Sequence, residues 1–216
     1  ASVSGVASLL AQMLNAPTGY HLTTAAGKGN HEENAIVLRI NSSKQATLGD
    51  EGYTLRVLPG QVVIAANKPQ GLFYGIQTLM QLLPPAVGSH TVIKDTPWKM
   101  PCVNIMDYPR FGWRGLMLDV SRHFFSKEFV KQYIDELVKY KFNVFHWHLT
   151  DDQGWRIEIK GLPGLTETGA WRVPRTGEWN SFASPQPGEK ATEGGYYTQE
   201  DIREVVAYAK ARFVTV

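Results

Sequence analysis

Polar side chains that could do chemistry follow two predicted strands, at the points where those strands end. Arg122 follows a predicted strand at 115–120, and Asp151 follows another at 143–149. In parallel βα architectures the ligand site gathers at the carboxyl ends of the strands, so these side chains are expected at one mouth. Arg122 could donate charge-assisted hydrogen bonds to ligand hydroxyls, such as those of a sugar, or to a carboxylate. The alternative is a structural ion pair with Asp119 or Asp151.

Two adjacent carboxylates, Asp151 and Asp152, occupy the start of the loop after the second of these strands. Neighbouring side chains point in different directions there, so one carboxylate can face the site while the other caps the loop. The alternative is that both are solvated or act only as caps.

Two histidines, His146 and His148, alternate on one face of the strand at 143–149. They could ligate a metal, as His-X-His does at the mouth of metal-dependent hydrolase barrels. A hydrogen-bonded interior histidine is the favoured interpretation, because zinc needs at least three protein ligands and no acidic or histidine partner occupies a suitable place. We therefore expect neither a metal nor another cofactor.

A long loop at 150–197 is rich in Gly, Pro and Trp. Loops of this length inside compact domains are usually functional. Its tryptophans could stack on the apolar face of a sugar ring or simply pin the loop down; they are Trp155, Trp171 and Trp179.

The elements that must position these side chains alternate along the second half of the chain. Strands are predicted at 115–120, 143–149 and 213–216, and helices at 127–141 and 199–211. This alternation is typical of βα units in a parallel sheet. Ser126 and Thr198 are suitable N-caps for the helices. The residues expected to face inward are Phe129, Tyr133, Ile134, Leu137 and Tyr140 on the first helix, and Ile202, Val205, Val206 and Ala209 on the second.

The first half of the chain has a different pattern, typical of a small α+β unit. Strands are predicted at 35–40, 53–58 and 62–66, the last two forming a hairpin through Pro59-Gly60, followed by a helix at 70–83. Apolar residues at helical spacing also occupy 6–14. Residues 84–112 are expected to connect the halves and to hold a short strand at 103–106, with a domain boundary near 110.

Composition narrows the function classes. The 216 residues are 43% hydrophobic and 19% charged, which indicates an ordered globular protein. A net charge of +2 with interspersed signs gives no basic stripe, so nucleic acid is not expected as a partner. Cys102 is the only cysteine, so no internal disulfide can form. The apolar stretch at 6–14 is too short to cross a bilayer.

Five motifs together resemble, in order and spacing, the β-N-acetylhexosaminidases of glycoside hydrolase family 20. The motifs are Asp107-Tyr-Pro-Arg-Phe111, Trp113-Arg-Gly115, Leu118-Asp-Val-Ser-Arg-His-Phe124, Tyr140-Lys-Phe-Asn-Val-Phe-His-Trp-His-Leu-Thr-Asp-Asp-Gln-Gly-Trp-Arg156 and Gly195-Tyr-Tyr-Thr-Gln-Glu-Asp-Ile202. The resemblance implies an α/β fold: a small α+β domain with linker at 1–110, then the first strands and helices of a (β/α)8 barrel at 111–216, truncated at Val216.

The same resemblance implies removal of terminal β-linked N-acetylglucosamine or N-acetylgalactosamine from glycans or chitooligosaccharides, as in chitin degradation. In this family the 2-acetamido oxygen of the substrate attacks the anomeric carbon, while a glutamic acid protonates the leaving oxygen and an aspartate orients the acetamide. By position, Arg122 matches the arginine that grips sugar hydroxyls. Asp151 and His148 fall in the active-site network, with Asp151 matching the aspartate that holds a histidine of a later loop.

The chain departs from the family pattern after the third predicted strand. The Pro-Gly-His segment and the catalytic Asp-Glu pair are not found up to Val216, so this chain alone is expected to be an inactive fragment. Two alternatives stay open: a metal-dependent TIM-barrel hydrolase built on His146 and His148, and a non-catalytic glycan-binding protein on a decayed scaffold. The resemblance implies a periplasmic or extracellular location, because bacterial relatives are commonly exported, and it leaves open whether a homodimer forms.

Overall fold

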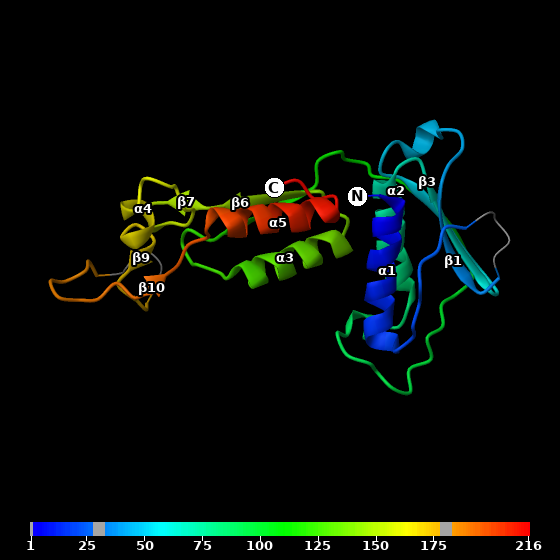
Figure 1. The fold of residues 1–216 in the computed structure, drawn as a ribbon, viewed down its shortest axis with the longest axis horizontal. Helices are drawn as coiled ribbons and strands as arrows, with labels where there is room; N and C mark the ends of the chain where they lie inside the picture. Colours follow the sequence, from blue (N-terminus) through cyan, green and yellow to red (C-terminus); the bar gives the residue numbers. More distant parts are fainter. Residues whose placement is uncertain (1, 28–32, 178–182) are drawn as a thin grey trace. The chain divides into compact units, whose positions relative to one another are not determined.

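The computed structural model describes residues 2–27, 33–177 and 183–216, and the chain folds into two units (Figure 1). The first unit comprises residues up to 112 together with 138–141 and 211–213. The second comprises 113–137, 142–210 and 214–216. None of the helices in the described part of the chain is both long and apolar enough to span a membrane.

The first unit is built on a four-stranded sheet with the strand order β1-β3-β2-β4. Its strands are β1 (Ala35–Ile40), β2 (Tyr53–Leu58), β3 (Gln61–Ala66) and β4 (Val103–Asp107). β1 pairs with β3 in parallel, and the other two pairings are antiparallel. The strands predicted at 35–40, 53–58, 62–66 and 103–106 are confirmed, as is the hairpin, whose turn places Gly60 at a φ of +75°.

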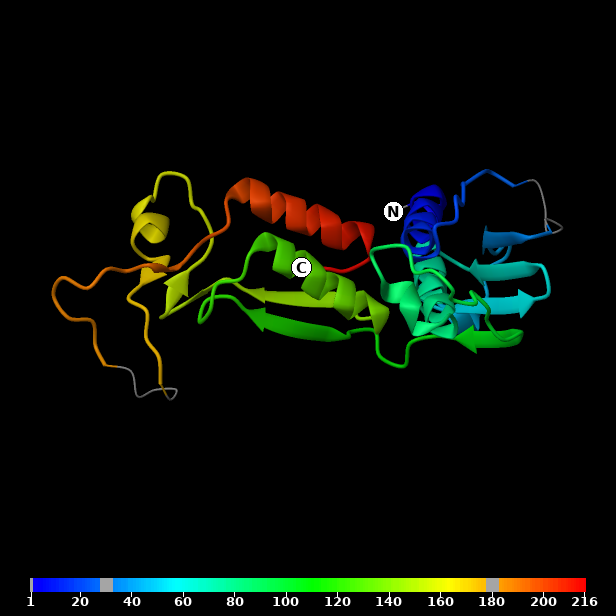
Figure 2. The same cartoon turned by 90° about the horizontal axis from the view of Figure 1, so that it is seen from below.

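Two helices, α1 (Val3–Thr18) and α2 (Pro69–Leu82), lie on one face of this sheet (Figures 1 and 2). The helical patterns at 6–14 and 70–83 are thereby confirmed. Short 3₁₀ turns, η1 (Ala46–Leu48) and η2 (Pro85–Gly88), complete the unit. Its core contains aromatic side chains and several aliphatic ones with no exposed surface, each of the latter contributing about 1.5–3 kcal/mol by burial; the aliphatic ones include Leu55, Ile64, Leu72, Ile76 and Leu79.

Close packing of α2 against the sheet requires a glycine at position 71. A Cβ there would lie 2.3 Å from the carbonyl oxygen of Gly52 and 2.8 Å from the Cβ of Ala66. Replacing a helical glycine by alanine ordinarily stabilises a helix by about 1 kcal/mol. We expect Gly71→Ala to destabilise the protein instead, by about 1–3 kcal/mol, because the added methyl overpacks the core.

The midpoint of thermal unfolding tests this prediction, with Gly88→Ala as the control. A Cβ on Gly88 meets nothing within 4 Å, so that midpoint should be nearly unchanged. A midpoint for Gly71→Ala equal to or above that of the wild type would show that the helix can move away from the sheet at little cost.

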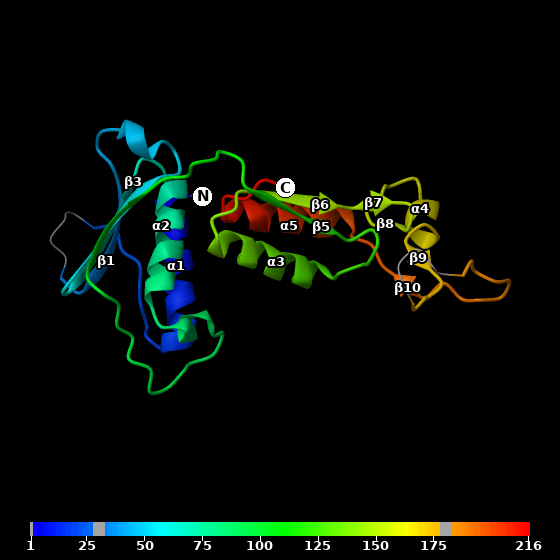
Figure 3. The same ribbon diagram turned by 180° about the vertical axis from the view of Figure 1, so that it is seen from behind.

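The second unit contains a parallel strand pair, β5 (Gly115–Asp119) and β6 (Val144–His148), with Gly115 opposite Val144. Two helices, α3 (Lys127–Lys139) and α5 (Gln199–Ala211), lie on one side of this pair (Figures 2 and 3). The predicted alternation of strand and helix is therefore confirmed for these four elements. Side chains buried in this layer include Val130, Ile134, Phe145, Val205 and Ala209.

Both predicted N-caps are present. The Ser126 hydroxyl accepts a hydrogen bond from the Phe129 backbone N–H at 3.2 Å. The Thr198 hydroxyl accepts one from the Asp201 N–H at 3.1 Å, while the Asp201 carboxylate accepts one from the Thr198 N–H at 3.0 Å. This reciprocal pair is a capping box, which fixes the start of α5 directly after the long loop.

Three inward-facing assignments on these helices were wrong. Phe129 is 39% exposed, Tyr140 is 73% exposed and Val206 is 41% exposed. The predicted core residues Ile134 and Leu137 are buried, together with Val130, and Phe129 points outward, where its ring stacks on Phe125 at 4.5 Å. Phe129 therefore lies at the edge of the predicted apolar face and not on its buried stripe, and Tyr140 lies one residue beyond the end of α3.

The strand predicted at 213–216 forms only a single parallel bridge, between Val144 and Thr215. The backbone reverses direction after α5 by placing Phe213 in the left-handed region, at a φ of 60°. Only Val214 to Val216 remain to pair with β6, through the hydrogen bond from Phe145 N–H to the Thr215 carbonyl at 2.8 Å. The direction of this segment agrees with the prediction, but its extent is shorter.

The long loop contains its own short elements. β7 (Thr150–Asp151) pairs with β8 (Gly154–Trp155), and β9 (Trp171–Arg172) pairs with β10 (Glu193–Gly194), both antiparallel; α4 (Gly164–Glu167) lies between the two pairs. The Trp155 indole N–H donates to the Ile157 carbonyl at 2.6 Å. Trp171 is 40% exposed, and Trp179 lies outside the described residues.

Candidate functional site

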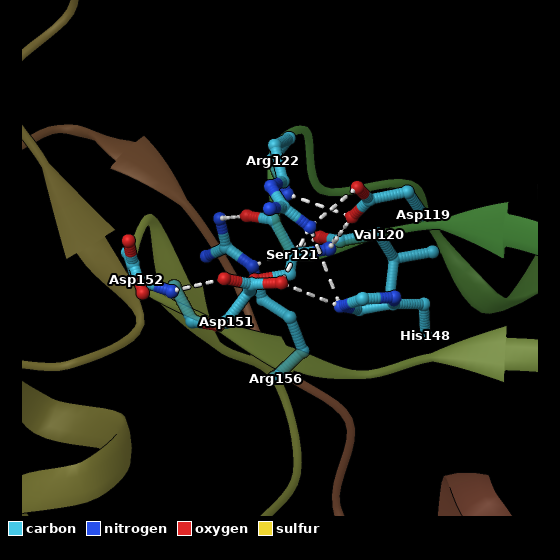
Figure 4. A network of polar contacts seen from close by, with 9 residues as sticks. Asp119, Val120, Ser121, Arg122, His148, Asp151, Asp152 and Arg156 are labelled. Atoms are coloured by element: carbon cyan, nitrogen blue, oxygen red, sulfur yellow. Dashed lines mark hydrogen bonds and ion pairs between the residues drawn. The ribbon is translucent and has the colours of Figure 1, made fainter.

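The parallel pairing of β5 with β6 brings their carboxyl ends together. In this register Asp119 lies opposite His148, and both are the last residues of their strands. Arg122 and Asp151 follow within three residues of the strand ends. All three side chains that the sequence singled out, Arg122, His148 and Asp151, therefore lie in one cluster with Asp119 (Figure 4).

Arg122 is at the centre of the cluster. Its Nη1 atom lies 2.5 Å from Oδ2 of Asp151 and 3.1 Å from Oδ2 of Asp119, and 3.4 Å from Nε2 of His148. The same Oδ2 atom of Asp151 lies 2.9 Å from Nε2 of His148. Both ion pairs that the sequence offered as alternatives thus exist at once, and they are shared by a single nitrogen.

The remaining donors of Arg122 are available to a ligand. Among the described residues only Nη1 has a partner, so the N–H groups on Nε and Nη2 are unpaired within this part of the chain. The side chain is 33% exposed. A guanidinium held along one edge and open along the other can donate to two adjacent hydroxyls or to a carboxylate.

The two adjacent aspartates have different surroundings. Asp151 directs its carboxylate to Arg122 and His148, and its side chain is 24% exposed. Asp152 is exposed, and its backbone N–H donates to Oδ1 of Asp151 at 2.8 Å. Only the first carboxylate therefore faces the cluster, while the second residue contributes its main chain (Figure 4).

The cluster keeps its carboxylates ionised. Partial burial alone would raise the pKa of Asp119, but hydrogen bonds from the Arg122 and Ser121 N–H groups and the charge of Arg122 outweigh it and lower that pKa. The pKa of Asp151 is lowered chiefly by the hydrogen bond from the Asp152 N–H; burial opposes this, and His148 and Arg122 lower the pKa further.

These directions predict how the cluster responds to pH. Both pKa values are lower in the folded protein than in the unfolded chain. The two carboxylates therefore stabilise the folded protein fully above the unfolded pKa of about 4, and this stabilisation is lost as the pH falls through the folded pKa values. We expect the thermal midpoint of wild type to lie above that of Asp119→Asn/Asp151→Asn at pH 5. The gap should close below about pH 4. A gap that widens on acidification would contradict this assignment.

His146 and His148 supply two nitrogens on one face of β6, with ring centres 6.1 Å apart. His148 Nε2 is engaged by Asp151 and Arg122. Within residues 2–27, 33–177 and 183–216, no group of three or more His, Cys, Asp or Glu side chains is arranged to hold a metal ion. The metal-hydrolase alternative therefore has two candidate ligands and no third among the described residues.

Two contributors to the site were not assigned by the sequence. Asp119 was considered only as an ion-pair partner, yet its Oδ1 also accepts hydrogen bonds from the N–H groups of Ser121 at 2.9 Å and Arg122 at 3.0 Å, forming an Asx turn. Arg156 lies in a recognised motif but had no assigned role. The available sequence signal for Arg156 was its position two residues after Gly154, shortly after the strand predicted at 143–149.

Fold and cluster together define an α/β protein with a polar cluster at the carboxyl ends of parallel strands, which is where such folds place their ligand sites. The model of the glycosyl hydrolase family 20 catalytic domain matches residues 111–216, and that of domain 2 of the same family matches residues 1–108. The chain belongs to glycosyl hydrolase family 20.

Known relatives agree with this assignment. The beta-hexosaminidase of Porphyromonas gingivalis is 43% identical over 211 residues, covering 98% of this chain and 25% of the relative. The N,N'-diacetylchitobiase of Vibrio harveyi is 39% identical over 168 residues, covering 76% of this chain and 18% of the relative. A mutant Streptomyces plicatus beta-hexosaminidase solved with its product GlcNAc is 42% identical, with a TM-score of 0.82, covering 99% of this chain and 38% of that one. The chain thus spans about a quarter of the length of the first of these relatives.

Proposed function

We propose that the protein containing this chain is a retaining exo-β-N-acetylhexosaminidase, which removes terminal β-linked N-acetylglucosamine or N-acetylgalactosamine. The observation that carries the proposal is the Arg122 guanidinium, which is fixed through Nη1 by Asp119 and Asp151, while Nε and Nη2 have no partner among the described residues and can donate to sugar hydroxyls. Relatives named beta-hexosaminidase and N,N'-diacetylchitobiase, and a structure with bound GlcNAc, support the choice of sugar.

In the proposed reaction the acetamide oxygen of the substrate forms a bond to the anomeric carbon as the bond from that carbon to the leaving oxygen breaks. A glutamic acid gives its proton to the leaving oxygen, and water later opens the cyclic intermediate with net retention. We assign this glutamic acid, and the aspartate that orients the acetamide, to parts of the protein outside these 216 residues, since the chain spans a small share of its relatives. Arg122 holds the sugar, and Asp151 with His148 orients Arg122.

The proposal is tested by assaying the whole protein with a chromogenic N-acetyl-β-glucosaminide and following the product anomer by NMR. Hydrolysis with retained β-configuration is expected. Absence of hydrolysis by a folded whole protein would contradict the proposed activity. Turnover by the 216-residue chain alone would contradict the assignment of the catalytic acid to another part of the protein.

We further propose chitooligosaccharides and β-N-acetylhexosamine-terminated glycans as substrates, and a periplasmic or extracellular location. The chitobiase relative supports the first of these. The second rests on the resemblance to family 20, whose bacterial members are commonly exported. Cell fractionation with the same chromogenic assay tests the location, and activity confined to the cytoplasm would contradict it.

A further inference from the structure

Arg156 is a buried arginine whose charge is satisfied by main-chain carbonyls. Only 1% of its surface is exposed, and burial lowers the pKa of its guanidinium. Its Nε, Nη1 and Nη2 atoms donate four hydrogen bonds, to the carbonyls of Val120 at 3.0 Å, Ala170 at 2.5 Å, Gly195 at 3.2 Å and Ser121 at 2.7 Å. Burying a charge is costly unless its donors are paired, so the site is built around this group.

The guanidinium has close neighbours besides its four acceptors. A Cβ added to Gly154 would lie 2.4 Å from the Cζ atom of Arg156, so only glycine leaves room there. The Phe124 ring centre lies 5.9 Å from Cζ, within cation–π range. Lysine has neither the planar shape nor the fork of donors that the four acceptors require.

Two of these acceptors belong to the turn that carries Arg122. The N–H groups of Ser121 and Arg122 are held by Asp119, and the carbonyls of Val120 and Ser121 are held by Arg156 (Figure 4). The buried Ser121 hydroxyl also donates to the Gly154 carbonyl at 2.7 Å. The main chain between the end of β5 and Arg122 is therefore fixed on both its donor and its acceptor sides.

We propose that Arg156 is a positioning residue for sugar recognition, which acts through Arg122 by fixing the turn from 120 to 122. The inference rests on the proposed function, because it assumes that Arg122 binds the sugar. Arg156 has no exposed donor and touches no substrate. Its contribution is to keep the open Nε and Nη2 edge of Arg122 in one direction before the substrate arrives, and a small displacement of such a group is costly.

A double-mutant cycle in the whole protein tests this role. The variants are Arg156→Met, Arg122→Met and the double variant, with kcat and KM measured for a chromogenic N-acetylglucosaminide. We expect Arg156→Met to lower kcat/KM by about 100-fold, with the same division between kcat and KM as Arg122→Met. In the Arg122→Met background, adding Arg156→Met should lower kcat/KM by less than about 3-fold, because the guanidinium that Arg156 positions is already absent.

Two further variants complete the experiment. Arg156→Lys should behave like Arg156→Met. Arg175→Met is the matched control, because Arg175 lies in the same loop but pairs with Glu189 at its side chain and makes no hydrogen bond to the turn. That control should stay within about twofold of wild-type kcat/KM.

The inference would be overturned if the double variant lost kcat/KM by the product of the two single-variant factors. An unchanged kcat/KM for Arg156→Met would also overturn it. If Arg156→Met fails to fold, Gly154→Ala displaces the guanidinium while keeping its charge and takes its place in the cycle. A wild-type protein without hexosaminidase activity would overturn the proposed function itself, which is a separate result. Loss of activity in Arg122→Met but additive behaviour with Arg156→Met would overturn only the positioning role.

Discussion

Arg122→Met in the whole protein is expected to lower kcat/KM for an N-acetylglucosaminide by about 10³-fold. The reason is that two charge-assisted hydrogen bonds to the sugar are lost, each contributing about 1.5–3 kcal/mol. Arg122→Lys should lose nearly as much, because one ammonium group cannot pair with Asp119 and Asp151 and still direct two donors at the sugar.

The free energy of unfolding of Arg122→Met serves as the control for its loss of activity. The ion pairs of Arg122 are partly exposed, so the free energy of unfolding should change by about 1 kcal/mol or less. The loss of activity would then come from the site and not from unfolding. A loss below about tenfold in kcat/KM would contradict the sugar-binding role.

The second large effect is expected for Asp151→Asn, which should lower kcat/KM by about 30- to 100-fold. Asparagine keeps the shape of the side chain but removes the charge that holds Nη1 of Arg122 at 2.5 Å and the hydrogen bond to His148 at 2.9 Å. Its amide group can also turn a donor toward the guanidinium, which repels it. Kinetics on the chromogenic substrate measure the effect.

The neighbouring residue is a matched control for this variant. Asp152→Asn makes the same chemical change one position along, on an exposed side chain, and keeps the backbone N–H that Asp151 accepts. Its kcat/KM should stay within about twofold of wild type. Equal losses in the two variants would show that net charge at this loop matters, and not the contact with Arg122.

The sequence predicted much of this site because a simple rule connects it to the fold. Strand patterns at 115–120 and 143–149 locate the carboxyl ends of two parallel strands, and side chains directly after them must meet. Arg122, His148 and Asp151 could be placed together on that basis. The hairpin and helix of the first unit were equally visible, because alternation and helical spacing are local properties.

What the sequence did not show depends on contacts between distant segments. Arg156 binds carbonyls that precede and follow it by up to 39 residues, and no local pattern distinguishes it from a solvated arginine in a glycine-rich loop. The exposed face of α3 was misassigned for a related reason. Phe129 fits the helical spacing of a core residue, and only the packing of Val130 and Ile134 decides which side is buried.

The strand order of the first sheet determines when that sheet can be completed during synthesis. β2 pairs with β4, and Tyr53 lies opposite Asp107, which is made 54 residues later. At ribosomal rates of about 5–20 residues per second, the outer edge of β2 stays unpaired for roughly 3–11 s. Unpaired strand edges join other chains readily, so nascent polypeptides are most prone to aggregate in this interval. All four strands of this sheet precede β5 in the chain, so they leave the ribosome before β5 and β6, the strands whose carboxyl ends hold the cluster of Arg122 and His148.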